Sequence, residues 1–257
     1  MGANKFLEGK TALVTGASRG LGRAMAERLA ALGALVALNY ASNDDAARST
    51  LSAIESAGGK AFLVKGAQGS YEAAENLLSL MDKELTERTG STGLDILINN
   101  AGGGPKADID ASTPEIFEKI FSDNLRGPFY ITKLFKPRMR SGGRIIYMSS
   151  LGAKNALTDY VAYALSKSAI ETFTVVMAKE FGPNNITVNC ISPGLIASDA
   201  NADIRANDDI RTYLEQTTPL RRLGVPADSA GVVESLVSEN MSYVTGQIIE
   251  VSGGMSL

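Results

Sequence analysis

Short apolar runs alternate with longer segments of helical period along almost the whole chain. The first pair shows the pattern: "TALVTG" (11–16) has the apolar, β-branched character of a buried strand, and "GRAMAERLAALG" (22–33) spaces its apolar residues along one helix face until Gly33 ends it. The same pattern predicts further strands at 34–40, 60–66, 94–102, 143–150, 186–194 and 246–254, and further helices at 44–59, 71–87, 114–140, 160–182 and 227–239. Parallel strands need crossover connections, which helices supply, and the helices then cover both faces of the sheet. The sequence therefore predicts an α/β fold, a doubly wound parallel sheet of about seven strands.

No break in this pattern divides the chain. Neither a Pro-, Ser- or Gly-rich linker nor an internal repeat interrupts it, and 257 residues are an ordinary length for one α/β domain. We therefore expect residues 1–257 to form a single domain. One stretch, residues 197–222, is polar and only weakly periodic, which is typical of a mobile lid, so we expect a substrate-binding lid there.

Composition excludes several classes of function. A net charge of −3 gives no basic surface for nucleic acid. The chain contains no run of about 18 apolar residues, the length that would predict a membrane span. The chain has one cysteine, Cys190, and no histidine, which excludes an internal disulfide and means that a zinc site would consist mostly of carboxylates, so we expect no metal. These features predict a cytoplasmic protein with no nucleic-acid or membrane partner.

A glycine-rich loop, "TGASRGLG" (15–22), connects the first strand to the first helix. Gly16 permits a tight turn, Gly20 lets the backbone approach a phosphate, and Gly22 lets the helix pack closely on the strand. The spacing is G-x-x-x-G-x-G instead of the common G-x-G-x-x-G, so the glycines alone are weak evidence. Their position at a helix start, where free N–H groups and the helix dipole favour an anion, predicts a dinucleotide site. The loop residues expected to bind it are Gly16, Ser18, Arg19, Gly20, Leu21 and Gly22.

The end of the second strand indicates which dinucleotide is bound. NAD sites usually place an acidic residue there to bind the ribose 2′-hydroxyl, but this strand ends "LNYASN" (38–43) with no acid. The guanidinium of Arg19 suits a 2′-phosphate, and Asn39 and Ser42 could add neutral hydrogen bonds, with Tyr40 and Ala41 beside them. We therefore expect NADPH; the alternative is that Arg19 is a solvated loop residue.

With no histidine, a proton-transferring reaction needs another group, and "DYVAYALSKSAIE" (159–171) offers one. Tyr163 and Lys167 are four residues apart and share a helix face, whereas Tyr160 has Ala164 at the corresponding position. A free tyrosine titrates near 10, and we expect the nearby ammonium to lower the pKa of Tyr163 toward the working range. Taken alone, this spacing also fits a surface helix with a solvated lysine.

Further motifs occur in order around the glycine-rich loop and the tyrosine–lysine pair: "NNAG" (99–102), "SDNLRG" (122–127), "YMSSLGA" (147–153), "SPGLIAS" (192–198) and "VTGQIIEVSGG" (244–254). With these motifs, "TGASRGLG" and the pair of Tyr163 and Lys167, the chain resembles the short-chain dehydrogenase/reductase family over nearly its full length. The resemblance implies a Rossmann-type fold.

The resemblance implies a catalytic role for each of four residues. Ser150, thirteen residues before Tyr163, would polarise a substrate carbonyl, while Ser149, one residue off, would be structural. Tyr163 would be the general acid in reduction, or the base in oxidation. Lys167 would bind the nicotinamide ribose and lower the pKa of the tyrosine, and Asn124 would hold a water that links Lys167 to solvent.

The resemblance also implies further binding residues. Ala67 stands where relatives often have an aspartate that meets the adenine, and Gln68 beside it would replace that contact. Further cofactor contacts are expected at Asn100, Ala101, Gly102, Pro193, Gly194, Ile196 and Ser198, besides Tyr163 and Lys167, and a substrate pocket at Leu151, Asn155 and Leu195. Relatives pair the 160–182 helix across a two-fold axis, so a homotetramer or homodimer is expected.

The predicted function is NADPH-dependent reduction of a ketone or 3-oxoacyl-type carbonyl to the alcohol. The substrate is a small carbonyl compound, carried by a protein if Arg126 meets an acidic carrier; the alternative is that Arg126 lies on a solvated helix face. Two other functions stay open: an NAD-dependent alcohol dehydrogenase of the same family, and an inert cofactor-binding regulatory protein.

Overall fold

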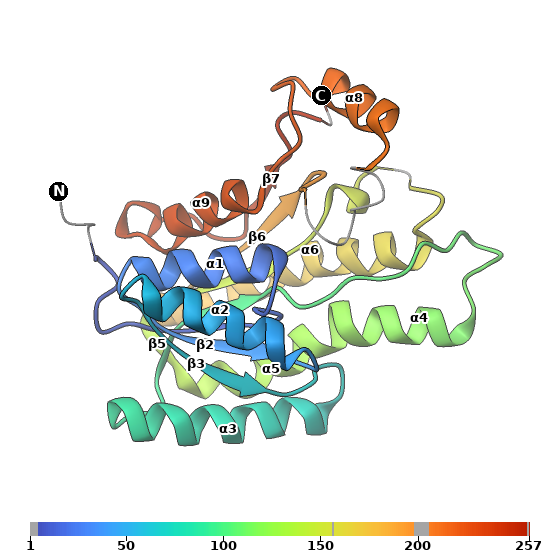
Figure 1. Cartoon of the computed structure of the whole chain (residues 1–257). Helices are drawn as coiled ribbons and strands as arrows, with labels where there is room; N and C mark the ends of the chain where they lie inside the picture. The colour runs from blue at the N-terminus through green and yellow to red at the C-terminus, as the bar shows by residue number, and fades with distance from the viewer. Residues whose placement is uncertain (1–4, 156, 198–205, 256) are drawn as a thin grey trace.

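A seven-stranded sheet forms the centre of the molecule (Figure 1). The computed structural model describes residues 5–155, 157–197, 206–255 and 257. All strand pairs are parallel, as predicted, and the strand order is β3-β2-β1-β4-β5-β6-β7. The strands are β1 (Thr11–Val14), β2 (Leu35–Tyr40), β3 (Lys60–Lys65), β4 (Leu94–Asn99), β5 (Met139–Met148), β6 (Thr187–Pro193) and β7 (Ile248–Val251).

Helices cover both faces of this sheet and bury two separate apolar cores (Figure 1). On one face, Met25, Ile54 and Val233 come from α1 (Gly20–Ala31), α2 (Asp44–Ser56) and α9 (Pro226–Val237). On the other, Leu77, Phe135 and Ile170 come from α3 (Tyr71–Thr89), α5 (Gly127–Phe135) and α6 (Val161–Phe181). Strands buried on both faces need apolar residues at successive positions, which is why β4 reads as a nearly continuous apolar run.

Polar side chains fix where several helices begin. The side chains of Asn43, Ser70 and Thr113 each accept a hydrogen bond from the backbone N–H three residues later, at the starts of α2, α3 and α4 (Pro114–Phe121). These caps satisfy N–H groups that have no partner inside the helix. Gly90 ends α3 in the left-handed conformation, with φ of 74°.

The single helix predicted for 114–140 is wrong in detail. The segment contains α4, a π-helical turn at Ser122–Arg126, α5 and a 3-10 turn at Lys136–Arg138, and β5 begins at Met139 instead of 143. Pro128 has no N–H to donate to the carbonyl of Asn124, so a regular α-helix cannot continue through this position. The sequence carried this signal in "NLRGPF".

The 197–222 segment also differs from a plain polar loop, because part of it is helical. α8 (Asp208–Thr217) begins at Asn207, whose side chain accepts a hydrogen bond from the backbone N–H of Ile210. Residues 198–205 of the expected lid lie outside the described part of the chain.

The strand order reverses between β1 and β4, which lie side by side although β2 and β3 separate them in the chain. Ligands of doubly wound sheets bind at such a switch point, outside the carboxyl ends of the strands. The fold therefore places the glycine-rich loop after β1 next to "NNAG" after β4.

Candidate functional site

A cavity of about 640 Å³ opens at this switch point. The loops that follow β1, β2, β4, β5 and β6 line it, together with one side of α6. Most of the predicted cofactor residues meet here: Gly16, Ser18, Arg19, Gly20, Leu21, Gly22, Tyr40, Ala41, Ser42, Asn100, Ala101, Gly102, Tyr163, Lys167 and Pro193.

Close contacts leave no room for a side chain at Gly22. A Cβ on Gly22 would lie 2.2 Å from the carbonyl oxygen of Gly16 and 2.5 Å from Nδ2 of Asn100. Nδ2 of Asn100 donates to the carbonyl oxygens of Thr15 at 2.8 Å and Gly16 at 3.2 Å. The "NNAG" segment thus holds the loop in place, and a side chain on Gly22 would separate the two.

The first turn of α1 has the features of an anion-binding site. Among the described residues no side chain caps this helix, unlike α2, α3 and α4, and its first turn contains no acidic residue. Gly20 has a φ of 58° and open space where a Cβ would point. Free N–H groups, the positive helix end and an approachable backbone together fit a pyrophosphate.

The cavity also fits a ribose phosphate. Arg19, Ser42 and Asn43 all line it, and no carboxylate lines the part of the cavity that the structure describes. The carboxylate of Asp44 is occupied by the hydroxyl of Tyr40 at 2.7 Å and by Lys65 at 2.8 Å. The site therefore presents a cation and neutral donors to a 2′-phosphate.

The structure corrects the expectations for Asn39 and Gln68. Asn39 is fully buried, and its Nδ2 donates to the carbonyl oxygens of Val64 at 3.1 Å and Gly66 at 3.0 Å. Nε2 of Gln68 donates to Oδ1 of Asn39 at 2.9 Å. Because both amides connect β2 to the end of β3, neither lines the cavity, and the exposed Ala67 does not line it either.

Tyr163 and Lys167 line the cavity, and Ser150 lies next to Tyr163. The hydroxyls of Ser150 and Tyr163 form a hydrogen bond, and Ser150 also accepts from the backbone N–H of Gly152 at 3.1 Å. The buried ammonium of Lys167 donates to the carbonyl oxygen of Met148 at 2.8 Å and lies 5.6 Å from the centre of the Tyr163 ring. The tyrosine hydroxyl is thus connected to Ser150, and the ammonium lies over its ring.

The expected lowering of the tyrosine pKa is wrong for this structure. Burial raises the pKa of Tyr163, and the hydrogen bond from Ser150 only partly opposes it. Burial also lowers the pKa of Lys167 to about 8, against a smaller opposing effect of the Cys190 thiol. Tyr163 therefore holds its proton at neutral pH, as a proton donor needs to.

Asn124 lies in the π-helical turn and is fully buried beside Lys167. Its Oδ1 accepts from the backbone N–H of Gly103 and its Nδ2 donates to the carbonyl oxygen of Gly103, both at 2.8 Å. A Cβ on Gly102 would lie 2.2 Å from the same Oδ1 and 3.5 Å from Nζ of Lys167. The side chain of Asn124 thus fixes the loop after β4 around the ammonium.

Three residues that line the cavity were missed from the sequence: Asn43, Met148 and Ser149. Asn43 directly follows the predicted "NYAS", so extending that segment to the helix cap would have found it. Ser149 was expected to be structural; it lines the cavity and donates to Oε1 of Glu171 at 2.9 Å, which connects the end of β5 to α6.

The remaining predicted residues lie near the cavity or outside the described chain. Gly194 accepts no side chain, because a Cβ there would lie 2.8 Å from Cα of Ser252 and 3.4 Å from Leu151. Ile196 is buried and pairs with Gly224 at a separate hollow. Asn155 is exposed, Leu195 is half-buried, and Ser198 lies outside the described residues.

Neither a membrane-spanning helix nor a cluster of metal ligands occurs in the described residues. No helix in that part of the chain is both long and apolar enough to cross a membrane. No group of three or more metal-ligating side chains was found in the same ranges.

Known proteins resemble the whole chain. A family model described as enoyl-(acyl carrier protein) reductase matches residues 16–256. The crystal structure of the angucycline C-6 ketoreductase LanV with bound NADP has a TM-score of 0.92 at 41% identity, with 97% of this chain and 96% of LanV covered. LugOII, described as a promiscuous reductase that catalyses keto-reduction at C1 during lugdunomycin biosynthesis, has a TM-score of 0.93 at 40% identity, with 98% and 99% covered. Versicolorin reductase 1 of Aspergillus parasiticus is 36% identical over 265 residues, 99% of each chain.

Proposed function

Because this chain belongs to the short-chain dehydrogenase/reductase family, we propose that it is an NADPH-dependent ketoreductase. The observation that carries the proposal is the hydrogen-bonded pair of Ser150 and Tyr163 next to the buried Lys167. Tyr163 and Lys167 line a cavity that Arg19 also lines, and no carboxylate of the described residues lines it. LanV, one of several relatives of known structure, was crystallised with bound NADP.

Each side chain of the site has a separate task in carbonyl reduction. When bound, NADPH supplies the hydride. The Ser150 hydroxyl hydrogen-bonds to the carbonyl oxygen and polarises it, and Tyr163 donates its proton to the same oxygen. Lys167 holds the nicotinamide ribose and keeps a positive charge beside the phenol, and Asn124 holds a water that returns protons from solvent.

The protonation state of Tyr163 suits the reductive direction. Because burial raises the pKa of Tyr163, the phenol is protonated at neutral pH, as the general acid of a carbonyl reduction needs to be.

We propose a fused-ring aromatic polyketide ketone as the substrate class. LanV is named as an angucycline ketoreductase and has been crystallised with NADP and rabelomycin, and LugOII and versicolorin reductase 1 are likewise named as reductases. Arg126, the residue considered for a carrier protein, is ion-paired with Glu118 at 2.9 Å within this chain. Arg126 thus already has an acidic partner within this chain.

The test compares reduction of 1-tetralone with that of an acetoacetyl thioester, each with NADPH and with NADH. We expect the highest kcat/KM for the fused-ring ketone with NADPH. In Arg19→Gln, the kcat/KM with NADPH should fall about 10- to 100-fold, the effect of losing a hydrogen bond to a charged group, with little change for NADH.

Arg23→Gln is the matched control for the Arg19 variant. Arg23 lies one turn later on α1, pairs with Glu27 at 2.7 Å and does not line the cavity, so its removal should leave cofactor preference unchanged. Equal use of NADH by the wild type, or a preference for the thioester, would contradict the proposal.

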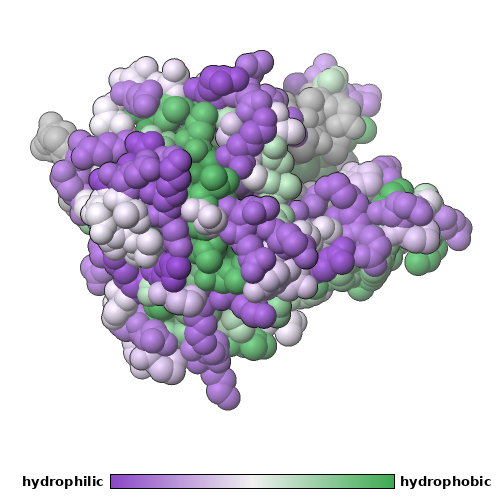
Figure 2. All heavy atoms as spheres, turned by 90° about the horizontal axis from the view of Figure 1, so that it is seen from below, coloured by the Kyte–Doolittle hydropathy of each residue, from purple (hydrophilic) through white to green (hydrophobic). Residues whose placement is uncertain are grey.

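We further propose that the enzyme is a homodimer or homotetramer that pairs through α5 and α6. Exposed apolar residues on these helices include Phe129, Val175 and Val176, at 44%, 52% and 54% exposure. Figure 2 shows the lower side of the molecule, where the α3 and α5 layer lies in Figure 1, with a band of apolar side chains between hydrophilic ones. Contiguous apolar surface of this kind marks protein interfaces.

Val175→Glu combined with Val176→Glu should shift the oligomer toward monomer, since two charges would be buried at the interface. Sedimentation velocity gives the mass of each species. Ile210→Glu on α8 places a charge at an equally exposed apolar position elsewhere and should leave the mass unchanged. A wild type that sediments as a monomer would contradict the pairing.

We also propose that the protein works in the cytoplasm. The free, buried thiol of Cys190 is compatible with a reducing compartment.

A further inference from the structure

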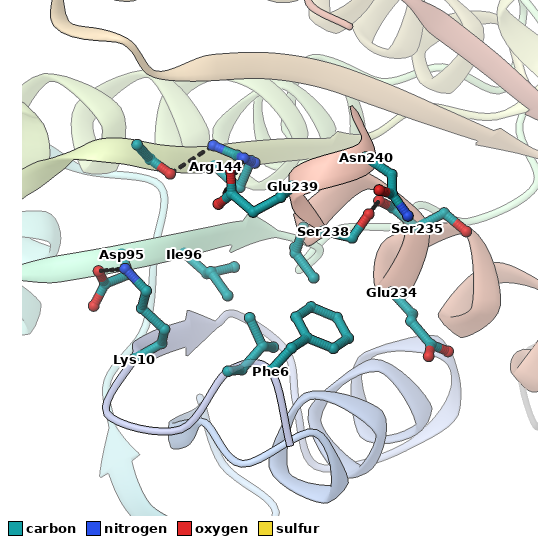
Figure 3. Close-up of a pocket in the computed structure, with 13 residues that line it drawn as sticks. Phe6, Lys10, Asp95, Ile96, Arg144, Glu234, Ser235, Ser238, Glu239 and Asn240 are labelled. Atoms are coloured by element: carbon teal, nitrogen blue, oxygen red, sulfur yellow. Dashed lines mark hydrogen bonds and ion pairs between the residues drawn. The ribbon is translucent and has the colours of Figure 1, made fainter. Parts of the chain in front are cut away.

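A second cavity of about 430 Å³ lies at the opposite, amino-terminal edge of the sheet (Figure 3). Residues before β1, at the start of β4, in β5, at the end of α9 and in the turn that follows α9 line it, and it shares no residue with the cofactor cavity. Its size lies in the range of small-molecule sites.

A buried arginine at this cavity has donor groups that the protein leaves unused. The side chain of Arg144 in β5 is only 5% exposed. Its Nη1 donates to the carbonyl oxygens of Gly142 and Gly143, but its Nε has no hydrogen-bond partner in the described chain. A buried donor without a partner is costly, so this edge of the guanidinium is prepared for an acceptor.

The group nearest to that edge is held only weakly. Nη2 of Arg144 lies 3.7 Å from Oε1 of Glu239, whose side chain is 90% exposed. A pair of this length with an exposed partner contributes little to stability. Moving the Glu239 carboxylate away from Arg144 into solvent therefore costs little free energy.

The acidic groups around the cavity are, in contrast, already paired. Asp95 accepts from Thr11, Lys10 and Arg140 at 2.7 to 3.1 Å, and Glu234 pairs with Arg28. The groups of this site that lack a strong partner are therefore the N–H donors of Arg144, which favour an anionic ligand over a cation. The Nε and Nη2 hydrogens of a guanidinium match the two oxygens of a carboxylate.

An apolar side chain forms the facing wall. Figure 3 shows Phe6 across the cavity from Arg144 and Glu239. Ile96 of β4 lies beside Arg144, its register partner on β5. Phe6 is 37% exposed and so offers its ring to a ligand. A compound with a carboxylate at one end and a flat apolar body would contact the arginine and the phenyl ring together.

We propose that this cavity is a second ligand site, which binds a small aromatic or apolar carboxylate. The ligand's carboxylate takes the place of Glu239 at the Nε–Nη2 edge of Arg144, and its apolar body packs on Phe6. The cofactor cavity opens at the carboxyl ends of the strands and shares no residue with this one, so the proposed site is separate from the reduction chemistry.

Benzoate is the probe, and benzamide, which has the same ring and no charge, is the matched control ligand. With the cofactor site saturated by NADPH, benzoate should raise Tm and bind saturably in calorimetry, whereas benzamide should not. Equal binding of the two compounds, or none by benzoate, would overturn the proposal.

Variants separate this cavity from any other place where benzoate could bind. Glu239→Gln should tighten benzoate binding several-fold, because it weakens the internal competitor, and Phe6→Ala should weaken it. Glu234→Gln is the control, since Glu234 lines the cavity but pairs with Arg28. Benzoate affinity that is unchanged in both test variants would place the ligand elsewhere. The affinity for NADPH should be the same in all variants, so the outcome is independent of the proposed function.

Discussion

Tyr163→Phe is expected to lower the kcat of ketone reduction by about 10²- to 10⁴-fold, the usual contribution of a positioned general acid. The substitution removes one oxygen atom, the proton donor that hydrogen-bonds to Ser150. The ring remains to pack beside Lys167 and the loop after β4, so the affinity for NADPH should change little. Steady-state kinetics and fluorescence titration of NADPH measure the two quantities.

Tyr160→Phe is the matched control for this prediction. Tyr160 precedes α6, and its ring lies 6.2 Å from that of Tyr163 in an edge-to-face arrangement, but Ala164 takes the place of a lysine one turn away. The control should therefore keep nearly full activity. Activity retained by Tyr163→Phe, or an equal loss in both variants, would remove Tyr163 from its proposed role.

The fold could be predicted from the sequence because its main signal is local. Strands such as "LDILIN" are buried on both faces and read as apolar runs, and Gly33 and Gly90 end helices with a positive φ, at 103° and 74°. The order of the strands was not predicted, because it depends on contacts between segments far apart in the chain, such as the pairing of β1 with β4. The break of the long helix at Asn124 was missed because periodicity continues across a π-helical turn, although Pro128 marks it.

The candidate site could be predicted where a backbone or a short spacing determines it. The glycine loop and the i, i+4 pair of Tyr163 and Lys167 are of this kind. Asn39 was misplaced because one position along a strand reverses the face to which a side chain points, and its neighbour Tyr40 lines the cavity instead. The direction of the Tyr163 pKa was missed because it depends on burial, which spacing does not show.

The cavity at Arg144 was not predicted at all. Its lining comes from segments far apart in the chain, and an arginine inside a strand gives no pattern that points to a ligand. Only the structure shows that this guanidinium is buried with an unused donor.

Lys167→Met is expected to remove most of the activity and yet to stabilise the protein without cofactor at pH 7. Burial lowers the pKa of Lys167 from 10.5 to about 8, a difference that corresponds to a cost of about 3 kcal/mol when the ammonium is charged. Methionine has a similar shape and no charge, and losing the hydrogen bond to the Met148 carbonyl costs about 1 kcal/mol. The free energy of unfolding should therefore rise by about 2 kcal/mol.

The pH dependence gives this prediction its sign. Between pH 8 and 10.5 the unfolded wild type binds more protons at Lys167 than the folded protein does, so this residue's contribution to stability increases with pH in that window. Below pH 8 both states are charged and the full cost is present. The advantage of Lys167→Met should accordingly be largest below pH 8 and shrink as the pH rises toward 10.5.

Urea unfolding at pH 7 and at pH 9.5 measures this difference, with the exposed Lys179 on the same helix changed to methionine as the control. Lys179→Met should alter neither stability nor activity. In the wild type, the kcat/KM for reduction should fall as the pH rises through about 8, because the charge beside Tyr163 is then lost. A variant that is less stable than the wild type at pH 7, or a difference that does not change with pH, would show that the ammonium is not held at an energetic cost in the folded protein. The buried ammonium of Lys167 accounts both for the lower stability of the wild type and for its activity. Its burial costs free energy in the folded protein, and its charge lies beside the proton donor Tyr163.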